Sequence, residues 1–268
     1  MSAGEVAQAT IRALDDPEAD LIVVNFCNVD VVGHIEDRAA ILQAVAEVDR
    51  RIGQVMAAAQ ARGVTAVVTA DHGTVERWLY PEGTVDTGHT DSPVPFIVVD
   101  PALRGTALRQ GGALTDVAPT VLHLLGLPQP GEMTSRSLLP DGVPRQRRRT
   151  LLVIADGWGA RDDAWGNLIL EAETPVMDQL QREWPTTRLE AAGEAVGMPA
   201  GTVGNSEAGH LHIGAGRCVL SDRVRIDRAI ADGSFFANDA FLWAMRGAKQ
   251  NGTRLHLLGI ISFYSSHG

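Results

Sequence analysis

The sequence predicts an α/β protein built on a mainly parallel sheet, and three observations support this prediction. Apolar, β-branched runs that suit strands buried on both faces occur at 21–26, 65–70 and 151–155. Each run leads into an aspartate, namely Asp30, Asp71 and Asp156. Helical segments alternate with the strands, and this order is typical of a parallel sheet whose crossovers are helices.

The first elements are a short helix at 7–14, a polar turn at 15–20 and the strand at 21–26. Residues 38–62 predict a long amphipathic helix that Gly63 is placed to end. Its apolar side chains recur at alternating steps of four and three residues. They are Ile41, Val45, Val48, Ile52 and Val55.

Two further strands are expected at 65–70 and 94–99, and a helix follows at 117–126. Asp116 is placed to cap this helix, and Pro119 lies in its first turn. Residues 128–150 predict a loop because proline and glycine recur there. Arg145 to Arg149 can be interpreted as a basic binding patch or as a solvated linker, and so short a run favours the linker.

The chain then begins a second series of elements, with a strand at 151–155. Thr174 and Pro175 suit the N-cap and first residue of a helix that ends near Trp184. A helix at 225–233 and a strand at 254–262 complete the expected elements.

Composition narrows the classes of function. The 268 residues suffice for one large or two modest domains, and the net charge of −10 argues against non-specific nucleic-acid binding. Neither a signal peptide nor an apolar run of about 20 residues is found, so we expect no membrane association. The two cysteines are expected to be reduced thiols of a cytoplasmic protein.

The three aspartates predict a binding site, because ligands of open parallel sheets gather beyond the carboxyl ends of the strands. One aspartate after a strand usually serves in a cap or turn, but three of them with histidines nearby favour a site. Asp30 and His34 would share one helical face and could share a metal. Asp71 and His72 would diverge in a strand, so they would serve different ions or one would support the other.

His89 lies in a loop that enters a strand, and it completes a set of carboxylates and imidazoles. Such ligands suit Zn²⁺ or Mn²⁺ better than Mg²⁺. His123, within a leucine-rich helix, and His256, within a predicted strand, are instead expected to be structural.

Ser206, in the motif GNSEAGH, is a candidate nucleophile that follows a glycine-rich stretch. Small residues let a backbone approach an anion closely. A serine needs a base or a metal to become reactive, and no GxSxG elbow is present, so metal coordination is the simplest activator. A serine that merely caps a glycine turn explains the pattern equally well.

Several motifs together closely resemble the cofactor-independent phosphoglycerate mutases, which are manganese enzymes of the alkaline phosphatase superfamily. The resemblance covers nearly the whole chain outside residues 140–149. The motifs are ADGWG (155–159), residues 193–217 around GNSEAGH, NFCNVDVVGH (25–34), TADHG (69–73), GHTDSPVPF (88–96) and residues 114–133.

The resemblance implies two Mn²⁺ ions, with Zn²⁺ or Mg²⁺ as alternatives, and a phosphoserine intermediate on Ser206. It also implies that His267 contacts the substrate, although the residues before His267 depart from the family's pattern. One ion would be held by Asp156, Ser206, Asp71 and His72, and the other by Asp30, His34 and His89.

The order of segments differs from the family's order. Residues 1–140 correspond to the family's C-terminal phosphatase-like part and residues 150–220 to its N-terminal part, joined by a linker at 141–149. The implied fold is therefore an alkaline-phosphatase-like α/β sheet in circularly permuted order. Permutation is often tolerated because domain termini lie close together.

Residues 221–268 correspond to only the beginning of the family's transferase domain, a stub of a second α/β domain. The arginines and the lysine that hold substrate in the family have no counterpart. The resemblance implies a mutase that interconverts 3- and 2-phosphoglycerate in glycolysis, with a partner chain supplying the missing domain. The alternatives are a metallophosphatase without mutase activity, or an inactive fragment that binds metal.

Overall fold

The structure is a computed structural model that describes residues 2–259. The chain divides into two compact units, residues 1–219 and 220–268, and each is described by itself. In the first unit the helices are α1 (Ala3–Ala13), α2 (Asn28–Gly33), α3 (Arg38–Ala61), α4 (Val117–Leu124), α5 (Leu168–Glu171), α6 (Pro175–Glu183) and α7 (Ser206–Ala215). The strands are β1 (Leu21–Phe26), β2 (Thr65–Thr69), β3 (Val94–Val99), β4 (Gly112–Ala113), β5 (Thr150–Ala155) and β6 (Thr186–Glu190).

The six strands form one sheet in the order β1-β5-β2-β3-β6-β4. β1, β5 and β2 run parallel, as do β6 and β4, whereas β3 is antiparallel to both of its neighbours. β5 therefore lies between two strands that precede it by many residues. The sheet confirms the predicted α/β class with mainly parallel strands.

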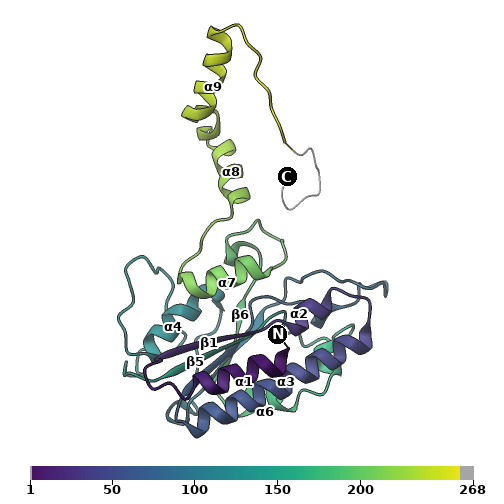
Figure 1. Cartoon of the computed structure of the whole chain (residues 1–268), viewed down its shortest axis with the longest axis vertical. Coiled ribbons are helices and arrows are strands. Elements are labelled where there is room, and N and C mark those ends of the chain that lie inside the picture. The colour runs from purple at the N-terminus through teal and green to yellow at the C-terminus, as the bar shows by residue number, and fades with distance from the viewer. Residues whose placement is uncertain (1, 260–268) are drawn as a thin grey trace. The chain divides into compact units, whose positions relative to one another are not determined.

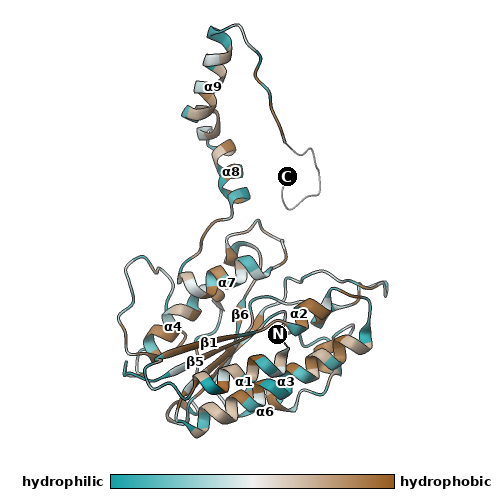
Figure 2. Ribbon diagram, in the orientation of Figure 1, coloured by the Kyte–Doolittle hydropathy of each residue, from teal (hydrophilic) through white to brown (hydrophobic). Residues whose placement is uncertain are grey.

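Helices cover both faces of the sheet. α3 packs against α1, α5 and α6, and Figure 1 shows the sheet between this layer and the pair α4 and α7. The apolar stripe that the sequence predicted for α3 is fully buried from Ile41 to Val55. Strands β1 and β5 are among the most hydrophobic segments in Figure 2, and every side chain of β5 is buried, as a central strand requires. Within residues 2–259, no helix is both long enough and apolar enough to cross a membrane.

The arginine-rich segment before β5 is anchored to the first part of the chain. The Arg149 guanidinium donates hydrogen bonds to the carbonyl oxygens of Leu14 (3.1 Å) and Asp16 (2.7 Å). Arg148 pairs with Asp100 at 3.3 Å, with only 9% of its side chain exposed. The last two arginines of this run, Arg148 and Arg149, are thus held by partners in the first part of the chain, whereas Arg145 and Arg147 are exposed.

At the starts of α4 and α6, the predicted N-cap residues Asp116 and Thr174 are in place, but neither side chain makes a capping hydrogen bond. Asp116 makes no capping bond to α4, because its carboxylate accepts from the Ala113 and Arg136 amides and pairs with Arg109. Thr174 precedes α6 but makes no capping bond either. The buried Asp49 of α3 takes that role, accepting from the amides of Val176 (3.1 Å) and Met177 (2.8 Å). A side chain distant in sequence thus caps α6.

We expect Asp49→Ala to lower the free energy of unfolding by about 2–3 kcal/mol, because it leaves one buried and one partly buried amide group at the start of α6 without acceptors. Urea denaturation followed by circular dichroism measures the change. Glu36→Ala removes an exposed carboxyl before α3 and serves as the control, with an expected change within about 0.5 kcal/mol. Equal effects of the two substitutions would contradict the capping role.

The second unit contains α8 (Asp222–Ala231) and α9 (Asp239–Gln250), joined by a short 3-10 helix. The aromatic side chains of Phe235 and Phe241 meet edge to face within it. The helix predicted at 225–233 is thus present as α8. The strand predicted at 254–262 is wrong for its described part, 254–259, and His256 is exposed there and not held within a strand. An apolar run forms a strand only where another strand can pair with it.

Candidate metal centre and nucleophile

The three predicted aspartates meet beyond the carboxyl ends of the strands, because each follows one of the parallel strands β1, β5 and β2. Asp156 directly follows β5, and Asp71 lies two residues beyond β2. Asp30 lies in α2, and its amide donates to the Asp156 carbonyl at 3.2 Å. The Gly157 amide donates to Asp71 Oδ1 at 3.2 Å, which links the second and third aspartates. Backbone contacts among these loops therefore fix the relative positions of the carboxylates.

Asp30, His34 and His89 form the first cluster. Nε2 of His34 lies 3.3 Å from Asp30 Oδ1, and Nε2 of His89 lies 3.2 Å from the same oxygen. The other ring nitrogen, Nδ1, is hydrogen-bonded to a backbone carbonyl oxygen in each case. His34 contacts Thr87 O (2.7 Å) and His89 contacts Gly204 O (3.1 Å). A carbonyl only accepts, so Nδ1 of each ring donates, and Nε2 is the nitrogen that faces Asp30 and would coordinate a cation. This is the arrangement that holds metal-binding histidines in proteins.

The second cluster surrounds His72, whose side chain is fully buried. Its Nδ1 donates to Gly73 O, and its Nε2 lies 2.9 Å from Ser206 Oγ and 3.5 Å from Asp156 Oδ1. Ser206 Oγ is itself 3.4 Å from Asp156 Oδ1. Asp71 Oδ2 is buried without an aligned hydrogen bond. The acceptor atoms of carboxylate, imidazole and hydroxyl groups thus converge here, and they outnumber the hydrogen-bond donors beside them.

This donor set fits divalent cations. Three groups of side chains bring one ligand atom each within 4.8 Å of one another: Asp30 with His34 and His89, Asp30 with His72 and Asp156, and Asp71 with Asp156 and His210. A buried carboxylate oxygen without a partner is costly unless a cation neutralises it. Oxygen and nitrogen ligands together suit Mn²⁺ or Zn²⁺.

The electrostatics of the cluster show how strongly its charges interact. Burial, together with the neighbouring charge of Asp71, raises the pKa of Asp156 to about 6. Burial opposes ionisation of Asp30 and Asp71 as well, but contacts with His89 and His210 respectively lower the pKa of each. The bond to Asp30 raises the pKa of His89, and the contact with Asp71 raises the pKa of His210 to about 9. Bound cations would displace these protons, so metal binding is expected to release protons.

Ser206 is the first residue of α7, and the loop before it is fixed on both sides. Asn205 caps the helix by accepting from the Ala208 amide at 2.8 Å, and the Gly204 amide donates to Thr90 O at 3.0 Å. The serine therefore does not cap the helix itself. Its hydroxyl lies at the positive end of the helix dipole, which favours a phosphate bound there.

His210 is part of the cluster, although the sequence pattern did not single it out. Its Nδ1 lies 3.1 Å from Asp71 Oδ2 and 2.9 Å from the Ser206 carbonyl. The spacing of four residues from Ser206 places both side chains on one face of a helix, and this signal could have found it. Thr74 and Asn25 were missed too, and they donate to Asp30 (3.3 Å) and Asp156 (2.8 Å) from loop and strand positions without a motif.

The remaining histidines differ in outcome. His123 is buried, and its ring nitrogens form hydrogen bonds with the Ser137 hydroxyl and the Val143 carbonyl. It is therefore structural, as expected. His267, expected to contact the substrate, lies outside the described residues.

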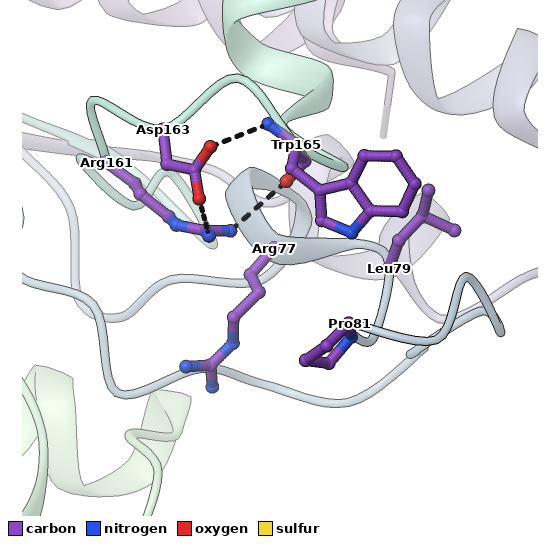
Figure 3. A pocket seen from close by; sticks show the side chains of 6 residues that line it. All are labelled: Arg77, Leu79, Pro81, Arg161, Asp163 and Trp165. Carbon is purple, nitrogen blue, oxygen red and sulfur yellow. Dashed lines mark hydrogen bonds and ion pairs between the residues drawn. The ribbon is translucent and has the colours of Figure 1, made fainter.

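A separate hollow of about 380 Å³ lies on the surface of the first unit (Figure 3). It is lined by Arg77, Leu79, Pro81, Arg161, Asp163 and Trp165. Its arginines are paired, Arg77 with Asp91 at 2.6 Å and Arg161 with Asp163. No metal-cluster side chain lines it, and its positive charge is already neutralised, so we assign it no role in phosphate binding.

Comparison with known families agrees with this geometry. A family model described as the Metalloenzyme superfamily matches residues 1–129 and 148–260, which is most of the chain. The chain belongs to the Metalloenzyme superfamily. Both matched segments of this superfamily member supply candidate ligands. The first supplies Asp30, Asp71 and the histidines near them, and the second supplies Asp156.

Curated relatives are named as phosphoglycerate mutases. The 2,3-bisphosphoglycerate-independent phosphoglycerate mutase 1 of Methanosarcina barkeri is 51% identical over 125 residues, which are 47% of this chain and 24% of the relative. The 2,3-bisphosphoglycerate-independent phosphoglycerate mutase of Moorella thermoacetica is 49% identical over 142 residues, 53% of this chain and 27% of the relative. The chain thus spans about a quarter of the length of these relatives.

Proposed function

We propose that this chain is a metal-dependent phosphoryl-transfer enzyme that acts through Ser206 and interconverts 3- and 2-phosphoglycerate. The observation that carries the proposal is the placement of Ser206 Oγ, 2.9 Å from His72 Nε2 and 3.4 Å from Asp156 Oδ1, at the start of α7. The names of the partly matched relatives support phosphoglycerate as the substrate class.

In the proposed reaction, Ser206 Oγ attacks the phosphorus of 3-phosphoglycerate. The bond from phosphorus to the substrate oxygen breaks, the freed alkoxide oxygen takes up a proton equivalent to the one that the serine hydroxyl releases, and the phosphoryl group resides on the serine. The other hydroxyl of the retained glycerate then attacks the phosphoserine and restores the free serine. Bound divalent cations would lower the pKa of the serine hydroxyl and stabilise the developing negative charge.

The proposed cofactor is a pair of Mn²⁺ ions, with Zn²⁺ or Mg²⁺ as alternatives. One would be held by Asp30, His34 and His89, and the other by Asp71, His72, Asp156 and Ser206. The first group coincides with a cluster of convergent ligand atoms, and both Asp71 and His72 contribute to other such clusters. Glycolysis and a cytoplasmic location belong to the same proposal.

A second candidate function is hydrolysis without mutase activity. Within residues 2–259, no arginine forms an ion pair or hydrogen bond with the side chains of the metal cluster or with Ser206. Positioning and electrostatic clamping carry most of the catalysis of phosphoryl transfer. Without a clamp, glycerate can leave and water can attack the phosphoserine in its place. A partner chain that supplies a transferase domain would provide that clamp.

The permuted order of the family's segments remains part of the proposal. We propose that residues 1–140 are the family's C-terminal part, 141–149 a linker, 150–220 its N-terminal part and 221–268 a truncated transferase segment. The insertion of β5 between β1 and β2 supports this, because both phosphatase-like segments contribute to one sheet.

³¹P NMR of 3-phosphoglycerate incubated with the protein and Mn²⁺ tests the proposal. A mutase is expected to produce the resonance of 2-phosphoglycerate, whereas a phosphatase produces inorganic phosphate. The control is the same mixture with EDTA. An unchanged spectrum at high protein concentration would reject both activities for the isolated chain.

A further inference from the structure

His210 connects the helix that carries the nucleophile to one of the metal-binding carboxylates. It lies one turn after Ser206 on α7, and its Nδ1 is 2.9 Å from the Ser206 carbonyl oxygen and 3.1 Å from Asp71 Oδ2. A carbonyl oxygen only accepts, so Nδ1 must carry a proton. That N–H points chiefly at the carbonyl, and it also lies beside Asp71 Oδ2, which has no aligned hydrogen-bond donor of its own.

The protonated nitrogen argues against a role for His210 as a metal ligand. Its ligand atom lies within 4.8 Å of those of Asp71 and Asp156, so distance alone would permit coordination. A nitrogen that donates its proton to a carbonyl has no lone pair to offer a cation. His210 therefore approaches Asp71 with a donor nitrogen, whereas His34, His72 and His89 approach the carboxylates with Nε2.

The packing of α7 against Asp71 supports this contact. A Cβ atom at Gly209 would lie 2.4 Å from the backbone oxygen of Asp71, so the helix is in close contact with this residue. Asp71 Oδ1 is held separately by the amides of His72 (3.0 Å) and Gly157 (3.2 Å). His210 is thus the side chain of α7 that restrains the remaining oxygen, Oδ2.

We propose that His210 is a positioning residue that fixes Asp71 relative to Ser206 without binding a cation itself. The proposal rests on the proposed function for its catalytic consequence, but its effect on metal binding can be measured without turnover. Loss of the contact lets the carboxylate rotate away from the ion it would share with Ser206.

Three substitutions in the full chain test the proposal. The amide nitrogen of Asn in His210→Asn can occupy the place of Nδ1, whereas His210→Gln places its amide one methylene farther out and His210→Ala removes the donor. We expect Mn²⁺ affinity, measured by calorimetry with the metal alone, to fall about 10–100-fold in the Gln and Ala variants and to stay within about threefold in the Asn variant. The kcat for p-nitrophenyl phosphate should follow the same order, with KM little changed.

His212→Ala is the matched control. His212 makes the same kind of bond on the same helix, from Nδ1 to Ala208 O at 2.7 Å, and accepts from the Val219 amide at 3.0 Å, away from Asp71. Its loss should lower the melting temperature and leave Mn²⁺ affinity unchanged.

Each other outcome overturns the positioning role. An equal loss of affinity in all three His210 variants would identify the imidazole as a ligand. Wild-type Mn²⁺ affinity in all three variants would mean that His210 only packs against its neighbours and does not position Asp71. If the wild-type protein binds Mn²⁺ but transfers no phosphoryl group, the proposed function fails. The calorimetric comparison of the His210 variants then still shows whether His210 positions Asp71.

Discussion

Ser206→Ala is expected to reduce phosphoryl transfer by about 10³-fold or more, because it removes the only atom to which the phosphoryl group is proposed to attach. The fold should survive, since Asn205 and not Ser206 caps α7. Release of p-nitrophenol from p-nitrophenyl phosphate measures the loss. Incubation with substrate followed by acid quenching and intact-mass measurement should show an added phosphoryl group on the wild-type protein alone.

The control for this substitution is Ser221→Ala, which removes the hydroxyl that caps α8 in the second unit. It should retain wild-type turnover. Mn²⁺ affinity of Ser206→Ala, measured by calorimetry, should fall less than that of Asp71→Asn, because a carboxylate contributes more to a cation site than a hydroxyl. Phosphate release that persists undiminished in Ser206→Ala would refute the serine route and leave direct attack by water.

Removal of metal is expected to abolish activity and lower the melting temperature. Asp30, Asp71 and Asp156 converge, and the raised pKa of Asp156 reflects its burial and the charges of Asp71 and Asp30 beside it. A cation that binds only the folded state at 100 times its dissociation constant contributes about 2.7 kcal/mol, which is about 5–10 °C in a domain of this size. Calorimetric scans of EDTA-treated protein, with and without added Mn²⁺, Zn²⁺ or Mg²⁺, measure this shift.

Asp30→Asn provides the matched comparison, because it keeps the size of the side chain and removes a charge that two clusters share. The variant should melt at or below the temperature of the metal-free wild type, because the lowered pKa of Asp30 means that its charge is stabilised by the neighbouring histidines. It should also gain little from added Mn²⁺. A melting temperature of the wild-type protein that no divalent cation changes would contradict the metal centre.

Much of the fold could be predicted from the sequence because its signals are local. Continuous apolar, β-branched residues predict buried strands such as 151–155. The periodic apolar stripe predicts α3. The aspartates at the ends of these strands were expected to meet, and the structure places them together. Parallel strands bring their carboxyl ends to one edge whatever their separation in the chain.

The features that were missed depend on partners distant in sequence. β6 alternates buried and exposed residues and includes Arg188 and Glu190, so its sequence gave little strand signal before β3 was known to pair with it. Asp49 caps α6 across 126 or more intervening residues, and no pattern marks it. The run at 254–259 has the composition of a strand but no neighbour to pair with in the described unit.

The central position of β5 has a consequence for the time course of folding. β1 and β2 both form their parallel ladders with β5, which is synthesised more than 80 residues after β2. During synthesis the first two strands therefore wait with unpaired edges, and contacts of such long sequence separation slow folding. We infer that β1 and β2 gain their shared neighbour, and the three aspartates their final positions, only after β5 has left the ribosome.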